Sequence, residues 1–432
     1  MFKIKENKTK ISTEILAGIT TFLTMAYILA VNPNMLSIAG MPIESVFLAT
    51  ALSAALASII MGLVANYPVA LAPGMGVNAF FTFTVVLQFG YSWEAALAAV
   101  VVSGVLFLLV SISGLRKMII NAIPKDLKLA FGAGIGFFIA FIGLQNSGLI
   151  VMNEATLVGL GAFTPPVLLA VFGIFITFAL LAKRVYAAVF FGLIITAIAG
   201  LIAGSFGVLG MPTMPTAVIS TSFDFSTFGA FFNGFGELFS KPDAWIVIFT
   251  FLFIDFFDTA GTLVAVANKT NLVNENGELE NIEKALLADS IGTIAGGMMG
   301  TSTVTSYVES AAGVGVGGRT GLTSVTTGVL FLLSIFFAPL LVAVTGTVTA
   351  PALIVVGVLM AQQIKGIDWD NFPIAASAFM SIITMILAYS ISDGIAVGFL
   401  TYSITQLFGG NMRKVHPIIW VLDIIFILHF IL

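Results

Sequence analysis

Apolar runs of membrane-spanning length recur from one end of the chain to the other. A helix needs about 20 mainly apolar residues to cross the hydrocarbon core of a bilayer, and the sequence accommodates fourteen such spans, several of them short. We expect these spans near residues 15–31, 46–64, 69–86, 95–112, 127–149, 167–181, 187–203, 245–266, 286–299, 302–316, 322–344, 350–362, 374–389 and 391–407. The pattern predicts an all-α polytopic membrane protein. The last apolar run, 418–432, is extra and either crosses the bilayer or lies along its interface.

Composition supports this assignment. Of the 432 residues, 59% are hydrophobic and 9% are charged, against about 25% charged in a typical soluble domain. The chain has no cysteine, which excludes disulfides, thiolate metal sites and thiol chemistry. We expect no cofactor and no nucleic-acid partner. The expected surroundings of the chain are a lipid bilayer.

The distribution of positive charge tests the span count. If the amino terminus is cytoplasmic, the basic loops, including those near Arg116 and Lys269, lie inside, and Lys241 alone of the 17 Lys and Arg lies outside. No small-residue cleavage site follows the Lys-rich start, so the first span is not a signal peptide. We expect a multi-pass protein of the cell (inner) membrane. Segment 205–244 is then extracytoplasmic, and its Pro, Gly and Phe content is typical of an amphipathic cover.

Three acidic side chains lie where a membrane span should have none. Asp255 and Asp258 fall inside span 245–266, and Glu309 falls inside a run rich in Gly, Ser and Thr. A carboxylate at bilayer depth costs about 2.5–3.5 kcal/mol on insertion scales, so such residues usually serve a function. We expect the substrate near them. Asp289, at the start of the ninth span, is interpreted as a helix-terminus or cytoplasmic-gate residue.

The third and tenth spans are interrupted at matching places in the two halves of the chain. Pro73 and Gly74 break the third, and glycines from Gly300 to Gly318 break the tenth. Broken helices at corresponding positions indicate the midplane site of a transporter built as an inverted repeat. Seven plus seven spans satisfy that geometry. Asn78 and Glu309 are expected in or near the first turn of the two half helices.

Four long motifs carry a family resemblance. They are GITTFLTMAY (18–27), ALAPGMGVNAFF (70–81), DFFDTAGT (255–262) and GTSTVTSYVESAAG (300–313). With these motifs the chain closely resembles the AzgA-like purine permeases, a branch of the nucleobase-cation symporter-2 superfamily, over about residues 11–408. The asparagine motif and the first-span histidine of the xanthine and urate branch are not found.

The resemblance implies a fold with fourteen spans in a 7+7 inverted repeat and short strands before the half helices of spans 3 and 10. It implies a core domain of spans 1–4 and 8–11 (residues 12–120 and 245–346) and a gate domain of spans 5–7 and 12–14 (residues 121–204 and 347–408). Segment 415–432 lies beyond this repeat.

The resemblance also implies proton-coupled uptake of purine bases. By the same likeness, Asp255 and Glu309 match the principal substrate-binding carboxylates, and Asn78 and Asp258 match positions needed for binding or transport.

The chemistry of the candidate residues agrees with a nucleobase. A carboxylate accepts two hydrogen bonds, and guanine presents an adjacent N1–H and 2-amino group. Hypoxanthine keeps the N1–H and adenine lacks it, so guanine and hypoxanthine are the expected substrates and adenine stays open. The rings of Phe80, Phe81 and Tyr307 are candidates for stacking on the base. Thr305 and Ser306 complete the candidate site.

The coupling ion is left open by residue types. Asp255 and Asp258 are three residues apart and therefore neighbours on a helix, so they and Glu309 are candidates to carry a proton. Acidic side chains and unwound carbonyls would serve sodium equally well.

Other classes remain as alternatives. They are a uracil- or xanthine-type nucleobase transporter, an anion transporter of the same fold, and an intramembrane enzyme. The enzyme is disfavoured because no nucleophile or metal set can be assembled at depth. A homodimer stays open as the oligomeric state.

Overall fold

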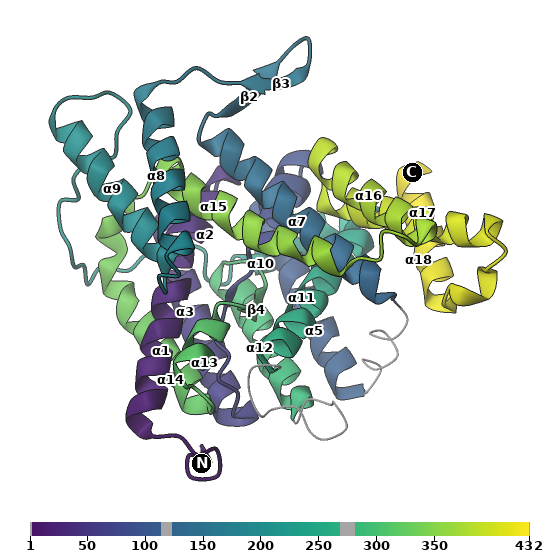
Figure 1. The fold of residues 1–432 in the computed structure, drawn as a ribbon, viewed down its shortest axis with the longest axis horizontal. Coiled ribbons are helices and arrows are strands. Elements are labelled where there is room, and N and C mark those ends of the chain that lie inside the picture. Colours follow the sequence, from purple (N-terminus) through teal and green to yellow (C-terminus); the bar gives the residue numbers. More distant parts are fainter. Residues whose placement is uncertain (1, 114–122, 268–280, 432) are drawn as a thin grey trace.

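The computed structural model describes residues 2–113, 123–267 and 281–431 and is almost entirely helical (Figure 1). The basic loops near Arg116 and Lys269 lie outside these ranges. Within them, eight helical segments are long and apolar enough to cross a membrane. They are Ile11–Ile38, Ile43–Ala65, Trp93–Ser113, Lys125–Asn146, Pro165–Ala182, Ala188–Ser205, Gly321–Ala343 and Gly346–Gly366. The multi-pass membrane fold is therefore confirmed, and the count of fourteen spans stays a prediction.

Most of the elements in the described ranges are α-helices, with short π and 3-10 segments (η) and four short strands. The first part of the chain contains α1 (Ile11–Met25), α2 (Ile28–Ile38), α3 (Ile43–Ile60), η1 (Met61–Ala65), β1 (Leu71–Pro73), α4 (Met75–Ala79), η2 (Phe80–Gln88), α5 (Trp93–Ser113), α7 (Lys125–Asn146), β2 (Ile150–Asn153), β3 (Leu157–Leu160), α8 (Pro165–Ala182) and α9 (Ala188–Ser205). The second part contains α10 (Phe231–Ser240), α11 (Ala244–Ala267), α12 (Ile282–Met299), β4 (Val304–Ser306), α13 (Ser310–Val316), α14 (Gly321–Ser334), η3 (Ile335–Ala343), α15 (Gly346–Ala361), η4 (Gln362–Gly366), α16 (Phe372–Leu387), α17 (Ile391–Phe408), η5 (Met412–Lys414) and α18 (Pro417–Ile431).

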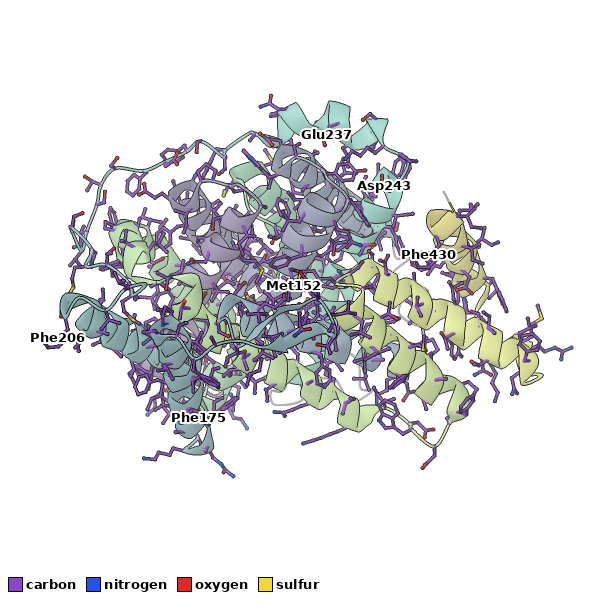
Figure 2. All side chains as sticks on the ribbon, turned by 90° about the horizontal axis from the view of Figure 1, so that it is seen from above. Met152, Phe175, Phe206, Glu237, Asp243 and Phe430 are labelled. Carbon is purple, nitrogen blue, oxygen red and sulfur yellow. The ribbon has the colours of Figure 1, made fainter. Side chains whose placement is uncertain are left out.

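The outer surface suits a lipid environment. Large apolar side chains that a soluble protein would bury are exposed on the peripheral helices, among them Phe175 on α8 and Phe206 after α9, which point outward in Figure 2. Figure 1 places α8 and α9 at one edge of the molecule and α16, α17 and α18 at the opposite edge. An apolar exterior around a packed interior is what a bilayer solvent requires.

The first predicted span is longer than expected and is broken. It continues from α1 through a turn at Ala26 and Tyr27 into α2, which ends at Ile38. Backbone bonds to the third residue back, such as Leu29 N to Ala26 O at 3.1 Å, tighten this turn. The predicted span ended at residue 31 because polar residues, beginning with Asn32, follow. Asn32 and Asn34 both lie inside α2.

The two interrupted spans cross as an antiparallel strand pair. β1 pairs with β4 in the register Leu71 with Ser306, and both strands are wholly buried. α4 starts directly after β1, and α13 starts shortly after β4. Gly74 is needed at this crossing because a Cβ there would lie 2.4 Å from Cγ2 of Thr305. The strands that the family resemblance implies are therefore present.

Two other features lie outside the predicted spans. β2 and β3 form an antiparallel hairpin that the sequence did not predict. In segment 205–244, α10 buries Phe231, Gly234 and Leu238 on one face, as expected for an amphipathic cover. It packs on α5 so closely that a Cβ at Gly234 would lie 2.1 Å from the carbonyl oxygen of Glu94.

The extra carboxyl-terminal run forms α18. This helix packs on α17, and the ring of Phe426 lies 6.0 Å from that of Phe399 with the planes nearly parallel. Asp423 is turned inward and is 3% exposed. Whether α18 crosses the bilayer stays open.

Candidate functional site

Glu309 lies in the turn between β4 and α13, as the broken tenth span predicted. One carboxylate oxygen, Oε1, accepts a hydrogen bond of 2.7 Å from the hydroxyl of Tyr27. Tyr27 is buried at the break between α1 and α2, whereas Glu309 is only half-buried. The fold therefore fixes one oxygen of this carboxylate and leaves part of the group accessible.

Asp258 belongs to the same group of side chains. It lies on α11, is also half-buried, and is close enough to interact electrostatically with Glu309 and with Tyr27. Two carboxylates that share a region of low dielectric repel each other unless one of them holds a proton or a cation lies between them. A single positive charge, either a proton or a cation, would therefore relieve the repulsion within this pair.

Asp255, one turn before Asp258 on α11, is directed elsewhere. It is 1% exposed, and its Oδ2 accepts a hydrogen bond of 2.7 Å from Thr293 on α12. Its Oδ1 is buried and has no hydrogen-bond partner among the residues described. The two aspartates interact electrostatically, as their spacing predicted, but their other partners differ.

Asp289 is not a helix-terminus residue, so that part of the prediction was wrong, and the cytoplasmic-gate role stays a prediction. It lies in the third turn of α12, is fully buried, and accepts hydrogen bonds from Thr259 at 2.8 Å and from Ser306 at 3.5 Å. Its Oδ2 has no partner within the described ranges, and it interacts electrostatically with Asp255. Asp289 is buried beside Asp255 because α11 and α12 both pack on β4. These elements are separate in sequence, so the sequence pattern could not predict the pair.

Strand β4 joins these groups. The hydroxyls of Thr305 and Thr259 lie 2.9 Å apart, and the amide of Ser306 donates to Thr259 at 3.2 Å. Thr293 contacts the carbonyl oxygen of Val304 at 3.1 Å. The predicted residues Thr305 and Ser306 are therefore in the same network as Asp289, and Thr259 and Thr293 are members that the sequence analysis missed.

Asn78 is buried in α4, close to the same strand crossing. Its Oδ1 accepts a short hydrogen bond from Ser302, and its Nδ2 is buried without an acceptor in the part of the chain that the structure covers. A buried amide donor that the protein does not satisfy is expensive. Asn78 therefore retains a donor that a carbonyl oxygen or ring nitrogen of a ligand could use.

The three aromatic candidates are enclosed by protein. The hydroxyl of Tyr307 donates to the carbonyl oxygen of Pro73 at 2.5 Å. Phe80 and Phe81 are fully buried, and their rings lie 4.8 and 6.3 Å from the ring of Phe251 on α11. These contacts fix the ring positions, and stacking on a base stays a prediction.

Tyr27 is the most informative residue that the sequence analysis overlooked. It is the last residue of the motif at 18–27, and only the turn between α1 and α2 brings its hydroxyl to Glu309. A tyrosine at the polar break of an apolar span was the available signal.

Among the residues described, no group of three or more His, Cys, Asp or Glu side chains could hold a metal ion.

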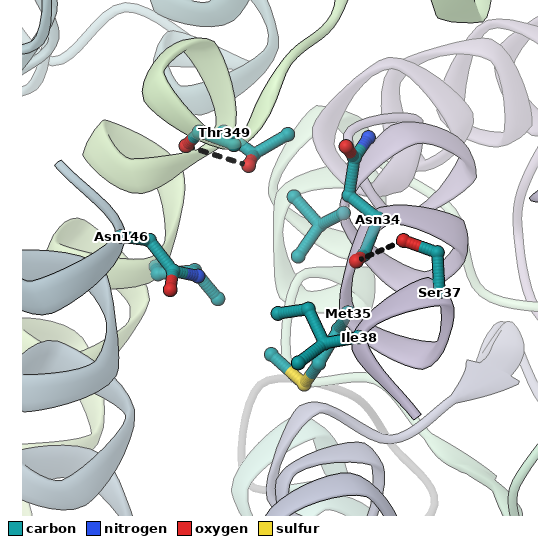
Figure 3. A pocket seen from close by; sticks show the side chains of 9 residues that line it. Asn34, Met35, Ser37, Ile38, Asn146 and Thr349 are labelled. Carbon is teal, nitrogen blue, oxygen red and sulfur yellow. Dashed lines mark hydrogen bonds between the residues drawn. The ribbon is translucent and has the colours of Figure 1, made fainter. Parts of the chain in front are cut away.

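A separate cleft lies between α2 on one side and α7 and α15 on the other (Figure 3). It encloses about 230 Å³. Its polar lining includes Asn34 and Ser37 from α2, Asn146 from α7, and Gly346 and Thr349 from α15. None of the carboxylates described above contributes to it.

Spanning helices around two broken segments, with carboxylates gathered at their crossing, define a membrane transporter. Comparison with known proteins identifies the group. The permease family Xan_ur_permease matches residues 12–397, and the chain belongs to this family. It is thus a permease and not an enzyme.

Two relatives and one solved structure show the range of similarity. The chain is 50% identical over 441 residues to guanine/hypoxanthine permease PbuG of Bacillus subtilis (strain 168), covering 100% of this chain and 98% of that protein. It is 41% identical over 429 residues to adenine permease AdeP of Escherichia coli (strain K12), covering 99% and 94%. The transmembrane domain of the bicarbonate transporter BicA of a cyanobacterium superposes with a TM-score of 0.61 at 16% identity, covering 94% and 97%, and shares the fold. The purine-permease resemblance is confirmed.

Proposed function

We propose that this protein takes up purine nucleobases, chiefly guanine and hypoxanthine, by proton-coupled alternating access. The observation that carries the proposal is the state of Glu309: one oxygen is fixed by Tyr27, the residue is half-buried, and Asp258 is its electrostatic neighbour. The printed names of relatives such as PbuG and AdeP support a purine as the substrate.

The carboxylate of Glu309 provides the recognition. Its free oxygen accepts the N1–H of an oxopurine, and guanine adds its 2-amino group as a second donor. Each charge-assisted hydrogen bond of this kind contributes about 1.5–3 kcal/mol. Adenine lacks the N1–H and is therefore bound more weakly. In this proposal Asp255 and Asn78 add an acceptor and a donor, each with one unpaired atom in the described structure.

The proton is carried by the acidic group around Glu309. Repulsion between Asp258 and Glu309 is relieved when one of them is protonated, and binding of a neutral base to Glu309 changes which of the two holds the proton. Asp255 and Asp289 form a second buried pair that can accept it. Sodium is the competing ion, because carboxylates and hydroxyls such as those of Thr259 and Thr305 also suit it.

Helix packing supports a division into two moving bodies. α12 packs on α5 and α3, and α14 packs on α3 and α1, within the proposed core (residues 12–120 and 245–346). α15 packs on α7 and α8, and α16 packs on α17 and α7, within the proposed gate (residues 121–204 and 347–408). In this proposal the fourteen spans form a 7+7 inverted repeat, the amino terminus is cytoplasmic, and the core carries the site past the gate. A homodimer is compatible with this arrangement.

Uptake into proteoliposomes tests the proposal. Labelled hypoxanthine should accumulate when an inward proton gradient is imposed, and accumulation should collapse when a protonophore is added. An inward sodium gradient at equal pH should have no effect. Accumulation driven by a sodium gradient alone would show that sodium, and not the proton, is the coupling ion. Absence of hypoxanthine, guanine and adenine uptake, with the protein correctly inserted, would refute the substrate class.

A further inference from the structure

The cleft between α2, α7 and α15 is not used by the site at the strand crossing. Its walls are apolar where Val31, Met35 and Leu353 line it, and polar groups are set among them (Figure 3). About 230 Å³ is below the range of about 300–1,000 Å³ typical of pockets for drug-sized ligands, which suits a ligand the size of a single base. Apolar walls with a few polar groups are the usual lining of a site for a small flat molecule.

The polar groups offer both donors and acceptors. Asn34 uses its Nδ2 to donate to the carbonyl oxygens of Ala30 and Val344, both at 2.8 Å, and its Oδ1 is left to accept. The side chain of Asn146 makes no hydrogen bond in the described structure, and Figure 3 shows its amide directed into the cleft. Gly346 is the first residue of α15, so its N–H has no acceptor within the helix.

The cleft is close to the proposed central site because α2 reaches both. Tyr27, which binds Glu309, directly precedes α2, and Asn34 is seven residues further along. At 1.5 Å per residue this is about 10 Å along the helix. Val31, one turn after Tyr27, already lines the cleft.

The cleft lies along α2, at the end of the first span far from the amino terminus, which is cytoplasmic in the proposed function. We propose that this cleft is a second, outer binding site for the transported purine base, which the base occupies before it reaches Glu309. The inference rests on the proposed function. The amides of Asn34 and Asn146 match the mixed donor and acceptor edge of a neutral base, and the apolar side chains contact its faces. α2 lies in the proposed core, whereas α7 and α15 lie in the proposed gate, so relative movement of the two bodies would change the cleft.

Single-cysteine labelling separates this site from the central one. The chain contains no cysteine, so Ser37→Cys introduces a single thiol at the cleft. A membrane-impermeant maleimide applied from outside should label it, and saturating hypoxanthine should slow labelling severalfold. The protection should persist when Glu309→Ala, or Glu309→Gln if the first variant does not insert, removes the central carboxylate. Ser222→Cys, in the exposed loop before α10, serves as the control that hypoxanthine does not protect.

The outcomes distinguish this inference from the proposed function. Protection that disappears in both Glu309 variants means that there is one site, and the outer site is refuted. The outer site is also refuted if hypoxanthine does not protect Ser37→Cys when Glu309 is intact, or if the maleimide does not label Ser37→Cys from outside. Loss of hypoxanthine uptake by the unsubstituted protein refutes the proposed function instead.

Filling the cleft gives an independent test. A Cβ at Gly346 would have nothing within 4 Å, so Gly346→Leu should fold and project into the cleft. The Leu side chain would take up space in the cleft, so we expect the KM for hypoxanthine uptake to rise about tenfold, while the equilibrium affinity of the central site in detergent-solubilised protein is retained. Gly236→Leu on α10 is the matched control, since its Cβ also meets nothing within 4 Å. An unchanged KM in Gly346→Leu would overturn the proposal.

Discussion

A glutamate lies at each end of α13 where α13 meets the first span, and the two glutamates differ in how many hydrogen-bond donors the protein supplies. Glu14 on α1 is fully buried and accepts hydrogen bonds from the amides of Arg319 (2.9 Å) and Thr320 (3.2 Å) and from the hydroxyl of Thr323 (2.6 Å). Glu309 receives one side-chain donor, from Tyr27, and is half-buried.

The difference separates a structural carboxylate from a functional one. Three donors satisfy Glu14 and hold the junction of α13 and α14 on α1, so nothing remains for a ligand. Glu309 keeps an accessible oxygen in a region where an unsatisfied charge is costly. The same membrane-embedded residue type therefore stabilises the fold at one end of α13 and, in our proposal, binds substrate at the other.

The largest expected effect is at Glu309. Glu309→Ala removes the acceptor for the oxopurine edge, and we expect hypoxanthine affinity to fall on the order of a hundredfold while the unfolding temperature is nearly unchanged. Isothermal titration on purified protein and a thermal melt check the two parts. Retained affinity would remove Glu309 from the site.

Asp258 should affect coupling more than binding. Asp258→Asn leaves Glu309 without its acidic neighbour, so proton-driven accumulation of hypoxanthine should be lost while exchange of labelled for unlabelled base continues. Uptake and counterflow in the same proteoliposomes measure the two rates. Equal losses in both assays would argue against this division of roles.

Glu14 should show the opposite pattern to Glu309. Glu14→Ala removes the acceptor of two backbone amides, that of buried Thr320 and that of half-buried Arg319. An unsatisfied buried donor costs about 1–3 kcal/mol, so the free energy of unfolding should fall by about 3 kcal/mol. Hypoxanthine affinity per folded molecule should stay the same. Chemical denaturation and binding on the folded fraction test this, and a selective loss of affinity would break the comparison.

Tyr27 should have a moderate effect because it orients Glu309 without replacing it. Tyr27→Phe removes a charge-assisted hydrogen bond, and we expect hypoxanthine affinity to fall about tenfold. Tyr91→Phe is the matched control, since its hydroxyl bonds Asp243 at 2.9 Å outside the site. A similar loss of hypoxanthine affinity in Tyr27→Phe and Tyr91→Phe would show that the loss does not come from the contact with Glu309.

The smallest effect is expected at Glu237, on α10 outside the membrane-spanning segments. Hydrogen bonds from Ser92 and the nearby Lys241 lower the pKa of Glu237 below its ordinary value of 4.5. A lowered pKa stabilises the folded state at pH values above 4.5, and this contribution is lost as pH falls through the folded-state pKa. Melting curves of the wild type and of Glu237→Gln should therefore differ slightly at pH 7, and the difference should shrink steadily as pH falls below 4.5. A difference that does not shrink below pH 4.5 would contradict this origin.

The sequence predicted the elements of the site better than their grouping. Pro73, Gly74 and Gly300 interrupt apolar runs locally, so the sequence correctly indicated that spans 3 and 10 are broken. The structure has the strands β1 and β4 at these breaks. Asp289 was misjudged because its burial depends on α11 and β4, which are distant in sequence. Spacing of three residues correctly indicated that Asp255 and Asp258 are neighbours, since the two interact electrostatically. Their other partners, Thr293 and Glu309, lie on different elements and could not be predicted from spacing.

Competition binding on purified wild-type protein and Glu309→Gln tests the central claim most directly. Guanine, hypoxanthine and adenine would each displace one labelled base. The account predicts that the wild type prefers guanine and hypoxanthine to adenine, and that Glu309→Gln, which replaces one carboxylate oxygen with an amide donor, loses most of this preference. An unchanged order and spacing of the three affinities in Glu309→Gln would contradict it.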